Sequence, residues 1–474
     1  MNELIKTIKK EQMSQKTKTE NGMKAKISTN NYCVDLFFKI GASRGLNILP
    51  DFINAYNENP DYALRIALWA RDIRCGAGER TLIINIINHL IKVNYKDAIK
   101  LISKLPELGR FKDLVEIELE NNSVKIFIFN IIKFELENKN GLVAKWLPRK
   151  SKDLKIKYFI NEFRKYLKLT PKEYRLLLSS LSNTVEQKMS SKKWNDIKYS
   201  HVPSLAMARY SKIFMKKDQE GFNNYKTNLV NKIEKVNSNA IYPYDVTKSL
   251  YLSGDEIIAE EQWKSLENYL DDRQILPMVD VSESMLNNKV GKNLKSWDIA
   301  ISLGLYIADK SKGVFKNTLL TFTDEPRIYL LNEKETLLNK LNQIRSHIGY
   351  NTNIADAFKA LLYYAKKGNV SKKDMPEMLL LLSDMQFDDH CIEGKNLNAF
   401  KLIKELYKKS NYEMPKLVFW NIAAKSNVPV KYNKEGVALI SGFSPSIMKS
   451  VLKTKDFSPL KIMEETILIN RYDI

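Results

Sequence analysis

The stretch Ile275-Leu-Pro-Met-Val-Asp280-Val-Ser282-Glu-Ser284-Met285 decides the fold of the second half of the chain. An uncharged apolar run ends there in an acid, and hydroxyls follow at alternate positions. Because residues two apart in a strand point to the same side, we expect Asp280, Ser282 and Ser284 to bring three oxygens together at a strand end. Hard oxygen ligands of this kind suit Mg²⁺. The alternative is an acidic turn after a buried strand.

Length and composition limit the possible classes. The 474 residues are enough for roughly two to four domains. The formal net charge of +21 favours an anionic partner, most often nucleic acid, although a lysine-rich composition without such a partner is the alternative. Three separated cysteines and four histidines disfavour a disulfide framework and a zinc site. With no signal peptide or membrane span, we expect a cytoplasmic protein with no membrane contact.

The hydrophobic period changes once along the chain. Residues 1–28 read as a flexible basic leader, and residues 29–270 follow helical periodicity. Helical pairs of this kind stack as a HEAT-like solenoid. Residues 271–474 alternate strands and helices, which predicts a doubly wound, Rossmann-like α/β domain. The expected strands are 275–281, 317–323, 327–331, 377–383, 416–422 and 436–441. The fold class is therefore α followed by α/β.

Two basic segments of the first half are candidate interfaces. Residues 71–80 place charges around two glycines between expected helices, which suits either an anion or an interhelical corner held by ion pairs. Residues 141–220 hold 19 Lys and Arg against 7 Asp and Glu. Interleaved aromatics suit single-stranded RNA, but a solvated helix face over an aromatic core explains them equally. These aromatics are Trp146, Tyr166, Trp194, Tyr199 and Tyr210.

Two later segments extend the opening cluster. Thr352 follows a glycine-containing loop and precedes a helix, and Asp384 ends the buried run 380–383. With Asp280, Ser282 and Ser284, this order resembles the metal-ion-dependent adhesion site (MIDAS) of von Willebrand factor type A domains. The resemblance implies that these five residues bind Mg²⁺ and leave one position open for a partner's carboxylate, so the ion would bind rather than catalyse.

One residue departs from that family pattern. Glu283 stands where the family has glycine between the two serines. If position 283 needs a positive φ, the glutamate costs about 1 kcal/mol. Alternatively, its carboxylate could fill the open position of the ion or repel a partner's acid.

Motifs along the whole chain resemble a group of uncharacterised plant, phage and large-virus proteins with a C-terminal von Willebrand A domain. They are found at 69–80, 105–114, 144–148, 194–197 and 202–204. The layout is similar to that of the Ro autoantigen family, whose TROVE module is a ring of HEAT-like repeats. Ro-like proteins bind small non-coding RNAs and single-stranded RNA ends. The expected RNA contacts here are Lys192, Lys193, Lys198, His201, Arg209, Arg74, Arg80 and Lys145.

The leading hypothesis is a monomeric, non-enzymatic RNA-binding protein that functions in a ribonucleoprotein. The alternative is a protein-interaction or virion-assembly component whose metal site grips an acidic residue of a partner. An enzyme is the least expected class, because no catalytic triad, Cys/His pair or Walker loop is present. A two-metal nuclease at the acids of residues 384–389 is likewise disfavoured.

Overall fold

The computed structural model describes residues 16–18, 24–26, 31–40, 47–181, 183–238, 241–270, 274–287, 289–291, 294–322, 326–345, 354–384, 396–422, 437–441 and 458–474. The chain forms two compact units. One comprises residues 1–44 and 241–466, and the other comprises residues 45–240 and 467–474. No helix in the described ranges is both long and apolar enough to cross a membrane.

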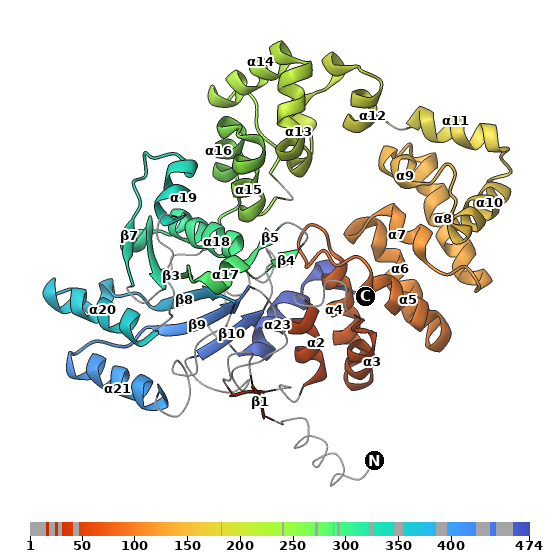
Figure 1. The fold of residues 1–474 in the computed structure, drawn as a ribbon. Coiled ribbons are helices and arrows are strands. Elements are labelled where there is room, and N and C mark those ends of the chain that lie inside the picture. The colour runs from red at the N-terminus through yellow and green to blue at the C-terminus, as the bar shows by residue number, and fades with distance from the viewer. Residues whose placement is uncertain are drawn as a thin grey trace, which may run out of the picture. The chain divides into compact units, whose positions relative to one another are not determined.

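The second of these units is helical, as the periodicity predicts. Its helices follow one another along the chain in short antiparallel pairs such as α3–α4 and α5–α6 (Figure 1). They are α3 (Leu49–Glu58), α4 (Pro60–Arg71), α5 (Leu82–Val93), α6 (Tyr95–Leu108), α7 (Phe111–Glu116), α8 (Asn122–Glu137), α9 (Gly141–Trp146), α10 (Leu154–Leu167), α11 (Pro171–Leu181), α12 (Val185–Ser190), η1 (Trp194–Asp196), η2 (Tyr199–His201), α13 (Ser204–Lys217), α14 (Gln219–Val230) and η5 (Asn470–Tyr472).

Short polar side chains start several of these helices. Asn59, Asn121 and Asp153 each accept a hydrogen bond from a backbone N–H in the first turn that follows. Such caps satisfy donors that a helix start leaves unpaired and contribute about 1 kcal/mol each. The frequent Asn and Asp residues of this sequence therefore divide the helical half into many short elements.

The other unit is α/β. Its strands are β3 (Ile275–Asp280), β6 (Thr318–Phe322), β7 (Ile328–Leu330), β8 (Met378–Ser383), β9 (Lys416–Asn421) and β10 (Val437–Ser441), with a minor pair β4 (Lys289–Gly291) and β5 (Leu294–Lys295). Its helices are α2 (Tyr32–Ile40), α15 (Pro243–Ser253), α16 (Glu256–Lys264), α17 (Glu283–Asn287), α18 (Ser296–Lys310), η3 (Gly313–Phe315), α19 (Leu337–Arg345), α20 (Ile354–Lys367), η4 (Lys372–Asp374), α21 (Asn396–Lys409) and α23 (Pro459–Ile467, whose last residue groups with the helical unit).

The main sheet has the strand order β10-β9-β8-β3-β6-β7 in the described part of the chain. All neighbours are parallel except β7, which runs antiparallel to β6. From β3 the chain adds β6 on one side and later returns to add β8 on the other. This is the strand order of a doubly wound sheet. The chain adds strands toward one edge after β3 and toward the other edge after β8, so the switch point of the topology lies between these two parallel strands.

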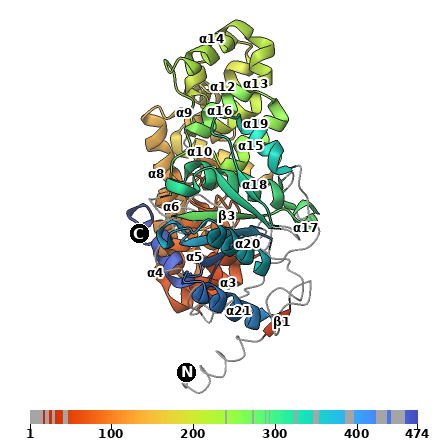
Figure 2. The same ribbon diagram turned by 90° about the vertical axis from the view of Figure 1, so that its left-hand side faces the viewer.

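Helices cover both faces of this sheet, as its uninterrupted apolar strands predict. Met278 and Phe419 pack on one face in a core with Phe358 of α20 and Tyr407 of α21. On the other face, α18 approaches so closely that a Cβ on Gly304 would overlap the Val279 side chain. Figure 2 shows α18 and α20 on opposite sides of β3.

The division into units differs from the predicted boundary at residue 270. Helices α15 and α16, expected to end the helical half, group with the α/β unit. The Trp263 indole donates to Asp309 of α18 at 3.2 Å, and the Tyr306 hydroxyl of α18 donates to the Glu267 carbonyl at 2.5 Å. Helical periodicity identifies these helices, but it contains no information about which neighbours they pack against.

The predicted flexible leader contains a short strand pair. Strands β1 (Lys16–Lys18) and β2 (Lys24–Lys26) run antiparallel, with Thr17 opposite Ala25. The sequence of this segment shows little periodicity, so this strand pair was not predicted.

Candidate functional site

Two acids end the two central strands of the sheet. Asp280 is the last residue of β3, and Asp384 directly follows β8. The strands pair in parallel with Val279 opposite Leu382, so both acids lie at the same edge. Their exposed fractions are 0% and 2%. In doubly wound sheets this position, at the carboxyl ends of the strands where the order reverses, is where ligands bind.

Hydroxyls and an amide surround Asp280. The Ser282 backbone N–H donates to one carboxylate oxygen at 3.0 Å, and the Ser383 hydroxyl donates to the other at 2.6 Å. The hydroxyls of Ser282 and Ser284 lie 3.0 Å apart. Three predicted residues are therefore brought together in one oxygen-rich cluster with Asp384.

The cluster is electrostatically unfavourable for two free carboxylates. Burial and the neighbouring Asp384 carboxylate raise the pKa of Asp280 to about 6, although hydrogen bonds from Ser282 and Ser383 oppose the rise. Like charges in a buried site disfavour ionisation of both groups, whereas a divalent cation between them would reverse that preference. The donor set is therefore suited to a hard cation such as Mg²⁺.

Position 283 carries no backbone strain. Glu283 begins α17, is exposed and is not among the described residues with positive φ. Met285 links this turn to the end of β8, because its buried sulfur accepts a hydrogen bond from the Asp384 backbone N–H at 3.1 Å. Helical backbone accommodates a glutamate here, so the cost expected for a positive φ at position 283 does not arise.

Ser383 and Thr352 mark the limits of the sequence prediction. Ser383 was missed, although it directly precedes Asp384 and its hydroxyl donates to Asp280. The predicted Thr352 lies outside the described residues. Within the described ranges, no three His, Cys, Asp or Glu side chains form a metal-binding group. The predicted ligand set contains only two acids, so hydroxyls would have to supply its other protein ligands.

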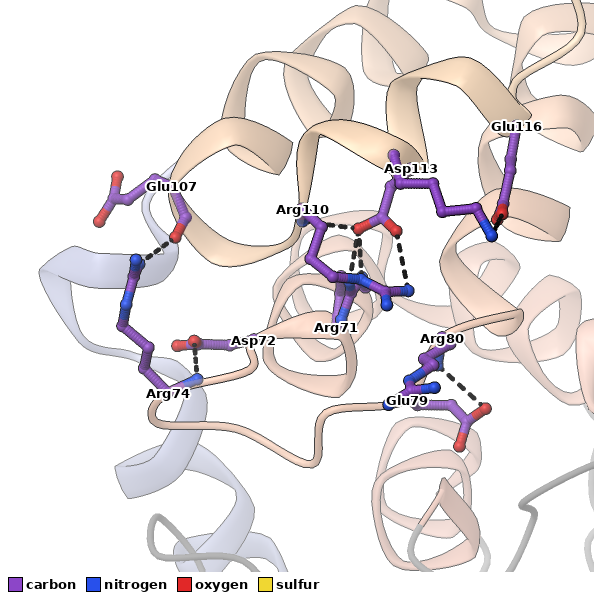
Figure 3. Close-up of polar contacts among 10 residues, drawn as sticks. Arg71, Asp72, Arg74, Glu79, Arg80, Glu107, Arg110, Asp113 and Glu116 are labelled. Atoms are coloured by element: carbon purple, nitrogen blue, oxygen red, sulfur yellow. Dashed lines mark hydrogen bonds and ion pairs between the residues drawn. The ribbon is translucent and has the colours of Figure 1, made fainter. Parts of the chain in front are cut away.

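The charged corner at residues 71–80 is built around a buried ion pair (Figure 3). The Arg71 guanidinium donates to Asp113 from Nε at 2.7 Å and from Nη2 at 2.5 Å, and both side chains have 0% exposure. Burial lowers the pKa of Arg71, and the Asp113 charge opposes that effect. A Cβ on Gly76 would overlap the Trp69 carbonyl, so the turn depends on this glycine. These contacts support the interpretation of residues 71–80 as an interhelical corner rather than an anion site.

The Asp72 side chain forms hydrogen bonds with the C-terminal residues of the same unit. Its buried carboxylate accepts from Arg471 Nε at 2.5 Å and from the Tyr472 hydroxyl at 3.1 Å. It also accepts the backbone N–H groups of Arg74 and Cys75. The hydrogen bond with Asp72 raises the pKa of Arg471. This segment was assigned to the α/β half from the sequence, because a contact between residues 400 positions apart leaves no local signal.

The predicted RNA contacts divide into two groups. Lys145 bridges to Glu186 at 3.0 Å, and the Arg74 guanidinium donates to the Glu107 carbonyl at 2.6 Å. Arg80 is exposed beside this corner. The remaining five are exposed, and in the described part of the chain none of their side chains pairs with a carboxylate. They are Lys192, Lys193, Lys198, His201 and Arg209.

Helix α13 adds further exposed cations to those at residues 192–201. Arg209, Lys212 and Lys216 are exposed at intervals of three and four residues, which places them along one helix face. Lys212 and Lys216 were not predicted from the sequence, although their spacing of three and four residues indicates a shared helix face. We call residues 192–216 the basic segment.

One of the candidate aromatic residues, Tyr199, belongs to a buried aromatic core. Tyr199 is buried against Phe214, Phe222 and Tyr225, with ring centroids between 5.0 and 5.6 Å away. Its hydroxyl donates to Asp218 at 2.7 Å. For Tyr199, the expectation of an aromatic core beneath a basic surface is therefore confirmed.

Fold and site together define a class of protein: a helical unit with a basic segment, and a doubly wound α/β unit with an acid–hydroxyl cluster at its strand reversal. A family model described as a domain of unknown function (DUF2828) matches residues 19–118 and 136–276, more than half of the chain. The chain belongs to this family. A second model, also a domain of unknown function (DUF7788), matches residues 274–468.

Two proteins are similar over most of the chain. The uncharacterized protein L728 of Acanthamoeba polyphaga mimivirus is 26% identical over 500 residues, which cover 94% of this chain and 86% of that protein. The crystal structure of the Deinococcus radiodurans RO (RSR) protein matches with a TM-score of 0.45 and 12% identity, over 91% of this chain and 93% of that one.

The buried ion pair of the corner gives a test of its structural role. Replacing Asp113 by Ala leaves the Arg71 charge buried without its partner and removes the cap of α7, so we expect unfolding to become easier by about 3–5 kcal/mol. Urea unfolding of the full chain measures the change. The matched control is Lys112→Ala, which breaks the exposed pair with Glu116 and should cost no more than about 1 kcal/mol. Equal losses in the two variants would contradict the assignment.

Proposed function

We propose that this chain is a non-enzymatic RNA-binding protein that contacts RNA through the basic segment at residues 192–216. The observation that carries the proposal is the set of exposed cations in this segment that have no carboxylate partner in the described part of the chain. A cation already paired within the protein gains little from a phosphate, whereas an unpaired one is available for it. Single-stranded RNA is the favoured partner, consistent with the Ro-like layout inferred from sequence motifs.

Phosphate contacts make the expected binding sensitive to salt. For a single-stranded uridine oligonucleotide, the double variant Lys192→Glu/Lys193→Glu should bind at least about tenfold more weakly at low salt. A plot of log affinity against log salt should become less steep by about 1.4, since each single-strand phosphate contact contributes about 0.7 to the magnitude of the slope. Filter binding between about 50 and 200 mM salt measures both quantities.

The matched control is Lys366→Glu/Lys367→Glu, which makes the same charge change at adjacent exposed lysines of α20. It should bind RNA nearly as tightly as the unmodified chain. Absence of RNA binding at the lowest salt, or equal loss in both double variants, would refute the proposal.

We further propose that the acid–hydroxyl cluster binds Mg²⁺ as a MIDAS-like site of a von Willebrand A-type domain. Asp280, Ser282, Ser284 and Asp384 would hold the ion together with Thr352. The bound ion would supply a positive charge that neutralises the two buried carboxylates. This need for neutralisation, visible in the raised pKa of Asp280, supports the proposal.

The Asp280→Asn variant distinguishes a loss of Mg²⁺ binding from a loss of folding stability. Because it removes one of two buried like charges, Asp280→Asn should unfold no more easily than the unmodified chain in EDTA. The unmodified chain should gain about 2.7 kcal/mol of stability from Mg²⁺ at a concentration a hundred times the dissociation constant, whereas Asp280→Asn should gain none. Thermal unfolding and calorimetric titration measure the two effects. Asp374→Asn, in η4 outside the cluster, is the control and should respond to Mg²⁺ normally.

A second function is favoured by this site rather than by the basic segment. The ion could grip a carboxylate of a partner protein, as in an interaction or virion-assembly component. The test is a pull-down with the immobilised chain after nuclease treatment, with Mg²⁺ or with EDTA. Capture of a protein that depends on Mg²⁺ and is lost in Asp280→Asn would support this function. Capture that ends with nuclease treatment would leave RNA as the partner.

A further inference from the structure

The helical unit contains an open cavity of about 550 Å³ whose wall includes Lys198 and its neighbours from the basic segment. The segment around η2 lines one part of it, and α14 with the following residues lines another. Its volume lies within the range of about 300–1,000 Å³ that is usual for sites of small organic ligands.

The charge of this cavity is opposite to that of the chain. Asp218, Glu220 and Glu234 line it, and Lys198 is the only cation among the lining residues. The whole chain carries +21. The carboxylates come from two places along the chain, the start of α14 and the residues after it, so they do not form a simple acidic run.

A buried hydroxyl in the cavity wall is left without a partner. Tyr225 is 3% exposed, and its hydroxyl makes no hydrogen bond in the described part of the chain. Its ring is fixed against Tyr199 and Phe222, with centroids 5.6 and 6.3 Å away. An unsatisfied buried hydroxyl is costly, so its presence in a cavity wall indicates a position where a bound group completes the hydrogen bonding.

The carboxylates of the wall keep acceptor positions beyond the hydrogen bonds that they already make. Asp218 accepts from the Tyr199 hydroxyl at 2.7 Å and from the Gly221 N–H at 3.1 Å, and Glu234 accepts from the Asn228 amide at 3.0 Å. These bonds use donors of the wall, whereas each carboxylate has about four acceptor positions. A group that brings hydrogen-bond donors and positive charge therefore fits the carboxylates of this wall.

We propose that this cavity binds an ammonium or guanidinium group of an organic cation. Such a group donates several hydrogen bonds and accepts none, which complements carboxylates and the Tyr225 oxygen. Phosphates and carboxylates are repelled by the same wall. The group could come from a free polyamine or from a basic side chain of a peptide, and both sources offer the same chemistry.

Calorimetric titration of the full chain with spermidine and with N-acetyl-arginine amide tests the proposal. The double variant Glu220→Gln/Glu234→Gln should weaken binding of the preferred probe at least about tenfold, since it removes two charge-assisted acceptors. Tyr225→Phe removes only the hydroxyl and should weaken binding several-fold. Lys198→Gln should strengthen it by removing a like charge.

The control is Glu120→Gln, an exposed acid of the same unit outside the cavity, which should bind like the unmodified chain. Glu220 is exposed, so the single variant Glu220→Gln gives a readable result if the double variant does not fold. Tighter binding of spermidine identifies a free polyamine as the source, and tighter binding of the arginine amide identifies a peptide. Absence of binding by both probes, or binding unchanged by the cavity variants, overturns the proposal.

Discussion

Two buried carboxylates at the reversal point of the sheet set the main constraint on the α/β unit. Asp280 and Asp384 are held at the ends of β3 and β8 because the apolar residues before them fix the parallel register of both strands. A carboxylate in such a position must be hydrogen-bonded, protonated or paired with a cation. Ser282 and Ser383 supply hydrogen bonds to Asp280, yet its pKa remains raised to about 6. The strand ends are thus built at a cost to stability that a bound cation would remove.

Local patterns explain why much of this arrangement could be predicted from the sequence. The uninterrupted apolar residues of β3 and β8, and the helical period that precedes residue 270, are all visible in the chain. Ser383 was missed because its role depends on the register between two strands about 100 residues apart. The same limit applies to α15 and α16, whose partners in α18 no local pattern specifies. Residue types and periods indicate elements, whereas pairings between distant elements need the structure.

Burial decides which charges of the helical unit are free to bind. Arg71 and Asp72 stand next to each other in a sequence motif that could be taken as an anion site, yet both are buried and committed to Asp113 and Arg471. Removing such a buried partner is costly, whereas changing an exposed lysine costs little stability. Lys192 and Lys193 are of the second kind. The charges open to functional change are therefore those that the fold does not require.

The basic segment and the acidic cavity share Lys198, so their proposed ligands would influence each other. With the cavity empty, Asp218, Glu220 and Glu234 repel an RNA backbone that approaches Lys198. An ammonium or guanidinium group in the cavity would neutralise part of this charge and so strengthen phosphate binding nearby. By thermodynamic reciprocity, bound RNA would strengthen cation binding by the same factor. Two sites of opposite charge within one stretch of chain would then act as one cooperative surface.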